Sequence, residues 1–222
     1  MTNTTTPNAT LTIAEIRDAA QRIEGAVVRT PTLHSKTLSR ITGAEVWLKF
    51  ENLQFTAAYK ERGALNALLM MDEARRAKGV IAASAGNHSQ GLSYHGTRLG
   101  VPVTIVMPRT TPTVKVLQTQ SVGGKVVLAE GIAVKEPGAY TSQIIAKVVD
   151  DIVLVDEPDL EEAVSLLLQI EKTVVEGAGA AGLAAVLRHR ERFAGRKVGL
   201  VLCGGNIDTR LLANVLLRDL AR

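Results

Sequence analysis

Apolar residues along the first half of the chain follow two different periods, and these periods alternate. Residues 45–51, EVWLKFE, place Val46, Leu48 and Phe50 on one side, which predicts a strand. After residue 60, leucines lie three and four positions beyond the first one, as in an amphipathic helix. The alternation continues, and we predict strands at 79–86, 101–108 and 125–131 and helices at 88–100 and from Pro112 onward.

The C-terminal half repeats the same alternation of short apolar runs and helix-spaced segments. Strands that alternate with helices of this length are typical of βαβ units. We therefore predict an α/β protein built on a parallel sheet, with a boundary near 130–138, where glycine, proline and charge gather. The remaining predicted elements are a capped helix beginning near 12–15 (TIAE), helices at 141–149, 156–169, 174–187 and from about Asp208, and strands at 151–155 and 197–203.

Composition narrows the protein class without identifying a ligand. The 222 residues are 46% hydrophobic and 22% charged, an ordinary balance for a globular protein. The net charge of +4 is spread along the chain and aromatic residues make up only 3%, so we predict no nucleic-acid partner. No apolar run is long enough to cross a membrane and no signal peptide is recognised, so the expected compartment is the cytoplasm. The single cysteine excludes an intrachain disulfide.

A predicted helix begins near Lys60, and its first turn also carries Arg62. Cations are disfavoured at this end of a helix because the backbone dipole places partial positive charge there. Lys60 is therefore either a surface lysine whose amine extends into water, or an amine kept uncharged by its position. An uncharged amine can attack an aldehyde.

Three glycine-containing turns follow predicted strands, at 84–91 (SAGNHSQG), 175–180 (VEGAGA) and 203–206 (CGGN). Parallel sheets bind ligands beyond the carboxyl ends of their strands, where glycine lets the backbone approach a ligand. Each turn alone is equally compatible with a ligand-binding role and with a purely structural role as a tight turn or helix cap. No G-x-G-x-x-G follows the first strand, which argues against a dinucleotide-binding domain.

Four motifs in order resemble those of threonine dehydratase, a pyridoxal-phosphate enzyme of the tryptophan-synthase-β fold type. They are ENLQFTAAYKERGALNAL, SAGNHSQG, VVEGAGAAGLAAVL and LCGGNIDTRLL. The resemblance covers nearly all the chain from about Leu11 onward. It implies a tryptophan-synthase-β-like fold in shortened form, pyridoxal 5'-phosphate as cofactor and a small amino acid as substrate.

The resemblance also implies roles for individual residues. Lys60 corresponds to the lysine that holds the cofactor as a Schiff base and removes the α-proton, and Asn87 to the asparagine beside the pyridoxal hydroxyl. Cys203 corresponds to the residue that faces the pyridine nitrogen. The implied cofactor-binding set is Lys60, Tyr59, Asn87, Glu176, Cys203 and Gly204, and the implied substrate-binding set is Ser84, Ala85, Gly86, Asn87 and His88.

The implied reaction is β-elimination that deaminates L-threonine to 2-oxobutanoate and ammonia, with L-serine giving pyruvate by the same route. Ala85 stands where the related serine racemases place a serine as second base, which favours elimination over racemisation. A non-catalytic remnant of the same fold, binding at most the cofactor, is the alternative. The histidines show no metal-ligand spacing, so we predict no metal site.

One departure from the family affects the phosphate end of the cofactor. The run of glycines that binds the phosphate is absent, because the chain passes from KVVLAEG directly to IAVKEPGAY. We expect the C-terminal regulatory domain of the biosynthetic forms to be absent as well. The implied division is a shortened cofactor domain from 1–48 and 132–222 and a small α/β domain from 49–131. Surfaces left open by the missing segment predict a homo-oligomer.

Overall fold

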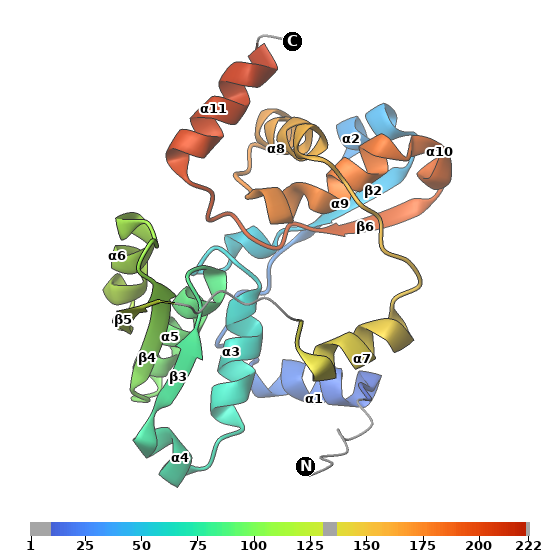
Figure 1. Cartoon of the computed structure of the whole chain (residues 1–222). Coiled ribbons are helices and arrows are strands. Elements are labelled where there is room, and N and C mark those ends of the chain that lie inside the picture. The colour runs from blue at the N-terminus through green and yellow to red at the C-terminus, as the bar shows by residue number, and fades with distance from the viewer. Residues whose placement is uncertain (1–9, 131–136, 221–222) are drawn as a thin grey trace, which may run out of the picture.

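The computed structural model describes residues 10–130 and 137–220, and its strands form two separate sheets. Figure 1 shows one sheet with β3, β4 and β5 and the other with β2 and β6, joined by the segment that contains helix α3. The structure confirms the predicted mixed α/β organisation.

The first sheet has the order β1-β2-β6. Strands β2 and β6 are parallel, with Val46 opposite Val198 and Leu48 opposite Leu200, whereas the short β1 pairs with β2 in the antiparallel direction. The elements of this unit are β1 (Thr32–His34), α2 (Lys36–Thr42), β2 (Glu45–Lys49), α8 (Glu157–Glu171), α9 (Gly177–Arg188), α10 (Arg190–Phe193), β6 (Lys197–Val201) and α11 (Thr209–Leu220).

The second sheet has the order β3-β4-β5 and is entirely parallel, as βαβ units require. The run of predicted strands and helices between 79 and 131 is confirmed here, because every strand has a neighbour that supplies its hydrogen bonds. The elements are α3 (Lys60–Leu69), α4 (Glu73–Lys78), β3 (Val80–Ala83), α5 (Asn87–Arg98), β4 (Val103–Pro108), α6 (Thr113–Ser121) and β5 (Lys125–Ala129).

Each sheet has its own hydrophobic core. Val46 and Leu48 of β2 are fully buried with Leu167 of α8 and Leu183 of α9. Around the second sheet, the buried apolar residues include Leu68, Leu92, Ile105 and Met107. The site described below lies where the two units meet.

Three further elements lie outside the two sheets. Helix α1 (Ile13–Arg22) begins with the predicted capping box, in which Thr12 and Glu15 bind each other's backbone amides. The 3-10 turn η1 (Glu51–Leu53) and helix α7 (Ala139–Val148) complete the set. Among the described residues, no helix combines the length and the apolar character that crossing a bilayer requires.

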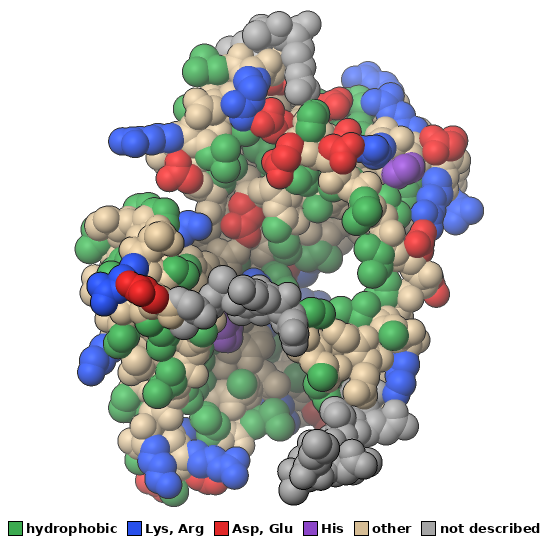
Figure 2. Space-filling model, in the orientation of Figure 1, with side chains coloured by type: hydrophobic (Ala, Val, Ile, Leu, Met, Phe, Trp, Pro, Cys, Tyr) green, Lys and Arg blue, Asp and Glu red, His purple; other side chains and the backbone are tan. Residues whose placement is uncertain are grey.

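The strand predicted at 151–155 is wrong. This segment is irregular in the structure, and the side chains of Ile152 and Leu154 are 70% and 81% exposed. Its apolar residues resemble those of a strand, but no strand in the described part of the chain pairs with it. Figure 2 shows hydrophobic side chains along the segment between α7 and α8, with an opening between this segment and the rest of the molecule.

The division of the chain into a cofactor domain and a small domain stays a prediction. The proposed boundary at 48–49 falls at the end of β2, whereas the boundary at 131–132 lies outside the described residues. Elements β1, α2, α4 and α10 have no counterpart in the predicted set because they are too short to establish a clear apolar period.

Candidate active site

A chain of polar side chains joins the two units. Asn87, the first residue of α5, donates through Nδ2 to Glu176 Oε1 over 2.6 Å. Its oxygen accepts from Asn206 Nδ2 over 2.8 Å, and the same Asn206 nitrogen donates to the carbonyl of Thr56 over 2.9 Å. The turns after β3 and β6 and the turn before α9 therefore meet at one place.

The segment before α3 pairs with the turn after β6. The Tyr59 amide donates to the Cys203 carbonyl over 3.0 Å, and Ala58 forms an isolated bridge with Gly204. The Gly205 amide donates to the Ala57 carbonyl over 2.8 Å. Because Lys60 comes directly after this pairing, its backbone is anchored to the turn that carries Cys203.

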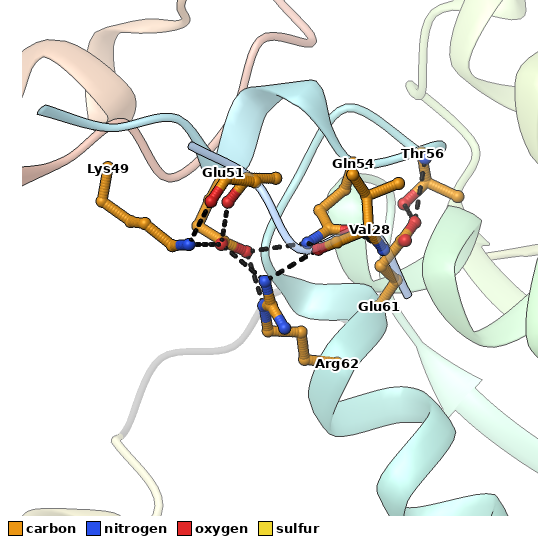
Figure 3. Close-up of polar contacts among 8 residues, drawn as sticks. Val28, Lys49, Glu51, Gln54, Thr56, Glu61 and Arg62 are labelled. Atoms are coloured by element: carbon orange, nitrogen blue, oxygen red, sulfur yellow. Dashed lines mark hydrogen bonds and ion pairs between the residues drawn. The ribbon is translucent and has the colours of Figure 1, made fainter. Parts of the chain in front are cut away.

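Figure 3 shows how the other cation in the first turn of α3 is neutralised. The Arg62 guanidinium forms two hydrogen bonds with the buried carboxylate of Glu51, over 2.7 and 2.8 Å. Burial alone would raise the pKa of Glu51, but hydrogen bonds from Arg62 and Thr30 outweigh it and lower that pKa to about 2. Arg62 is thus turned toward Glu51, whereas Lys60 faces the cavity described next.

A cavity of about 330 Å³ lies between the units, within the range of small-molecule sites. Lys60 opens into it from α3, and Gly86 and Asn87 line it from the start of α5. Glu176 and Asn206 line it from the turns of the other unit.

Two groups beside the cavity have shifted pKa values. Burial, reinforced by the nearby Lys60 ammonium, lowers the pKa of His88 below its usual range. Burial and then the Glu176 carboxylate raise the pKa of the Cys203 thiol. Both shifts favour the uncharged form, so His88 is a neutral imidazole and Cys203 a neutral thiol near neutral pH.

The lack of space for a Cβ explains two glycines of the site. A Cβ on Gly204 would collide with the side chains of Glu176 and Asn87. A Cβ on Gly179 would lie 2.5 Å from the Gly204 carbonyl oxygen. Glycine at these positions lets the first turn of α9 lie directly against the turn after β6.

The structure brings most of the predicted site residues into or beside this cavity. Lys60, Gly86, Asn87 and Glu176 line it, whereas Tyr59, Cys203 and Gly204 do not line it and lie on the paired segments next to Lys60. The predicted substrate-binding residues Ser84 to His88 form the continuous turn from β3 into α5.

Within that turn, the Ser84 amide donates to the Val106 carbonyl and Ala85 packs against the core of the second sheet. These contacts hold Ser84 and Ala85 to the second unit. Tyr59 is 44% exposed.

Sequence reasoning missed Asn206, Lys115 and Gln118, which also line the cavity. Asn206 is the last residue of the motif CGGN, in which only Cys203 and Gly204 were predicted to bind the cofactor. Lys115 and Gln118 lie on α6, which follows β4, so the rule that ligands bind beyond parallel strands could have found them. Across residues 10–130 and 137–220, no three His, Cys, Asp or Glu side chains are grouped as a metal site needs.

The profile of the family described as "Pyridoxal-phosphate dependent enzyme" matches residues 23–131 and 126–204. The chain belongs to this family. The two matched stretches overlap at 126–131, which places a discontinuity relative to the family in that region.

The curated relatives of this family member include ammonia-lyases. It is 29% identical to the L-threonine ammonia-lyase of Thermotoga maritima, over 96% of this chain and 80% of that protein. It is 30% identical to the enzyme of the same name from Geobacter sulfurreducens, over 92% and 78%. An L-threo-3-hydroxyaspartate ammonia-lyase from Pseudomonas sp. is 28% identical, over 91% and 97%. The resemblance to threonine dehydratase is thereby confirmed.

Solved structures confirm the predicted tryptophan-synthase-β-like fold. The threonine deaminase of T.th. has a TM-score of 0.81 at 25% identity, over 89% of this chain and 99% of that one. Serine racemase from Dictyostelium discoideum has a TM-score of 0.84 at 24% identity, over 90% and 100%.

The alignment with the Thermotoga protein runs over 320 residues although this chain has 222, so roughly a hundred positions have no counterpart here. The fold is therefore present in shortened form.

The family's cofactor is pyridoxal 5'-phosphate, and the donors of the cavity fit one end of it. The Lys60 amine suits the aldehyde and the Asn87 amide suits the ring hydroxyl. Cys203 does not line the cavity, but its neutral thiol, on the turn paired with the segment before Lys60, would suit the pyridine nitrogen. The glycine run that the phosphate needs in the family is absent from the sequence. A phosphate bound in this cavity would therefore be held by other groups.

Proposed function

We propose that this protein is a pyridoxal-phosphate-dependent ammonia-lyase that deaminates L-threonine to 2-oxobutanoate and ammonia. The observation that carries the proposal is that Lys60, an exposed lysine at the start of α3, lines a cavity shared with Asn87 and Glu176. The segment before Lys60 is held to the turn at Cys203 by backbone hydrogen bonds, so the backbone from which the Lys60 side chain extends is fixed. Similarity to threonine ammonia-lyases supports the reaction class.

The residues of the chain supply binding and proton transfer. Pyridoxal phosphate, when bound, supplies an aldehyde and an electron-withdrawing ring. Lys60 would hold the aldehyde carbon until the substrate amine displaces it, and its freed Nζ would then accept the proton from the substrate α-carbon. Helix α5 begins at Asn87 without a side-chain cap, so the first backbone amides of this helix, at Asn87 and His88, are offered to the substrate carboxylate. Loss of the β-hydroxyl as water, followed by addition of water and release of ammonia, gives the keto acid.

Cys203 adjusts how strongly the cofactor ring withdraws electrons. Its thiol stays protonated because burial and the Glu176 carboxylate raise its pKa. A neutral thiol, unlike a carboxylate, does not hold a proton on the pyridine nitrogen. This environment suits prompt elimination rather than a long-lived carbanion.

Ala85 favours elimination over racemisation. Its methyl group carries no transferable proton, and it packs against the core of the second sheet. L-Serine would give pyruvate by the same route. L-threo-3-Hydroxyaspartate, which appears in the name of one relative, carries a second carboxylate. The ratios of kcat/KM for L-threonine, L-serine and L-threo-3-hydroxyaspartate would rank the substrate preference of this protein.

The test is to trap the bound cofactor by reduction. Cofactor-loaded protein is treated with borohydride, digested and mapped by mass spectrometry, and we expect the label on Lys60. Lys60→Ala should lose the label and lower keto-acid formation at least about a hundredfold. Lys78→Ala, which removes an exposed lysine at the end of α4, is the matched control and should retain both.

The outcomes of this test separate the two candidate functions. Fully loaded wild type with the label elsewhere would falsify the assignment of Lys60. Label on Lys60 without keto-acid formation favours a protein that binds the cofactor without lyase activity. That second candidate is supported by the roughly one hundred alignment positions that lack a counterpart in this chain.

A further inference from the structure

A second lysine opens into the cavity that contains Lys60. Lys115 lies in the first turn of α6, and Gln118 lies three residues later on the same face of that helix. Both line the cavity, and the Gln90 amide donates to Gln118 Oε1 over 3.4 Å. Helix α6 therefore presents an ammonium and an amide to the space reached by Lys60.

Within the described part of the chain, Lys115 has no partner of opposite charge. It is half-buried, and no ion pair within residues 10–130 and 137–220 includes it. The carboxylate that lines the cavity, Glu176, accepts a hydrogen bond from Asn87 instead. A partly desolvated, unpaired ammonium favours the binding of an anion beside it, because the two can form charge-assisted hydrogen bonds.

The charge of the cavity matches a cofactor with a phosphate. Lys60 and Lys115 carry two positive charges against one negative charge on Glu176. When Lys60 bonds to the aldehyde, Lys115 is the cation that is left for a phosphate of nearly two negative charges. Gly177 and Ala178 line the cavity as well, at the start of α9, which has no side-chain cap.

We propose that Lys115 binds the phosphate of pyridoxal phosphate and, with Gln118, takes the place of the missing glycine run. This inference rests on the proposed function, because it assumes that the cofactor bonds to Lys60. It assigns to α6 a role in cofactor binding that follows from the cavity of this shortened chain. In this arrangement a charged side chain on the second unit does what a nest of backbone amides does in the family.

The experiment compares two aldehydes that differ only in the phosphate. Apparent Kd values for pyridoxal phosphate and for pyridoxal are measured by absorbance titration of the wild type and of Lys115→Gln. We expect the substitution to weaken pyridoxal phosphate binding at least about tenfold and to change pyridoxal binding less than about twofold. Inorganic phosphate should compete with pyridoxal phosphate in the wild type and much less in the variant.

Two further variants test the specificity of the effect. Lys115→Arg keeps the charge and should retain most of the preference for the phosphorylated aldehyde. Lys125→Gln removes an exposed lysine of β5 outside the cavity and should behave as wild type. Melting temperatures of all variants check that each one folds.

The outcomes distinguish this inference from the proposed function. Wild type that binds neither aldehyde at Lys60 overturns both. Wild type that binds both aldehydes, with the same change or no change for both in Lys115→Gln, overturns only the role of Lys115. In a third outcome, Lys115→Gln loses kcat/KM selectively for L-threo-3-hydroxyaspartate and keeps the preference for the phosphorylated aldehyde. This result would assign Lys115 to a substrate carboxylate and would also overturn its role in phosphate binding.

Discussion

Glu51 lies between the end of β2 and the first turn of α3, where its carboxylate binds Arg62 and Thr30. The ion pair between Glu51 and Arg62 explains how a helix that presents Lys60 to a ligand can carry a second cation in its first turn. The Arg62 charge is compensated locally, so it adds little to the potential at the helix start. Glu51 is thus a positioning residue for the turn that carries Lys60.

The lowered pKa of Glu51 predicts an acid-sensitive contribution to stability. Its pKa falls from an ordinary 4.5 to about 2 in the folded chain, so the folded state binds this proton more weakly. The contribution is complete above pH 4.5 and is lost as pH falls toward 2. The wild type should therefore lose more unfolding free energy between pH 7 and pH 3 than the Glu51→Gln variant does. The difference between the two proteins should be about 2 kcal/mol, measured by urea unfolding at each pH.

The control for this prediction is Glu45→Gln, which removes an exposed carboxylate paired with Lys197. It should leave the difference between the two pH values nearly unchanged, because solvent screens exposed pairs. If Glu51→Gln keeps the full pH dependence of the wild type, the ion pair with Arg62 does not stabilise the folded protein.

At the scale of elements, the site depends on the contact between α3 and α5. A Cβ on Gly91 would lie 2.9 Å from Glu61 Cα and 3.0 Å from its amide nitrogen, so the two helix backbones touch here. Asn87 lies one turn before Gly91, and Lys60 directly precedes Glu61. The contact therefore sets the distance between two proposed cofactor-binding residues.

Gly91→Ala should separate the helices, because backbone atoms cannot move aside. We expect a loss of unfolding free energy of roughly 1–3 kcal/mol and weaker pyridoxal phosphate binding, measured by urea unfolding and absorbance titration. Gly63→Ala is the matched control on α3: its Cβ would meet nothing within 4 Å. It should stabilise the helix by about 0.5–1 kcal/mol. Equal stability of the two variants would contradict the close contact at Gly91.

Most elements could be predicted from their apolar period, including β2 and β6, which pair with each other from opposite ends of the chain, but whether an apolar run gains a partner strand could not. The parallel strands between 79 and 131 were predicted correctly because each βαβ unit supplies the next strand. Residues 151–155 have the apolar residues of a strand, but a strand needs hydrogen bonds from a neighbour. Lys60 and Asn87 were found through motifs, whereas Lys115 joins them only when α6 packs beside α5.

At the scale of the whole molecule, the shortened chain leaves apolar surface uncovered. Strand β6 lies at an edge of its sheet, and Val201 is 55% exposed. Val148, the last residue of α7, is 60% exposed, and Ile152 and Leu154, between α7 and α8, are 70% and 81% exposed. Figure 2 shows hydrophobic side chains along the segment between α7 and α8. An open sheet edge and an exposed apolar segment are the kinds of surface that proteins cover by association.

We expect a second copy of the chain to cover this surface. Sedimentation velocity of the wild type at micromolar concentration should show a dimer or larger species, and Ile152→Lys combined with Leu154→Lys should shift it to monomer. Charged side chains on this segment would have to be desolvated in the interface, which opposes association. Met70→Lys, at an equally exposed apolar position after α3, is the control and should leave the oligomer intact. A monomeric wild type would show that this surface faces solvent, and the double variant would then change solubility rather than mass.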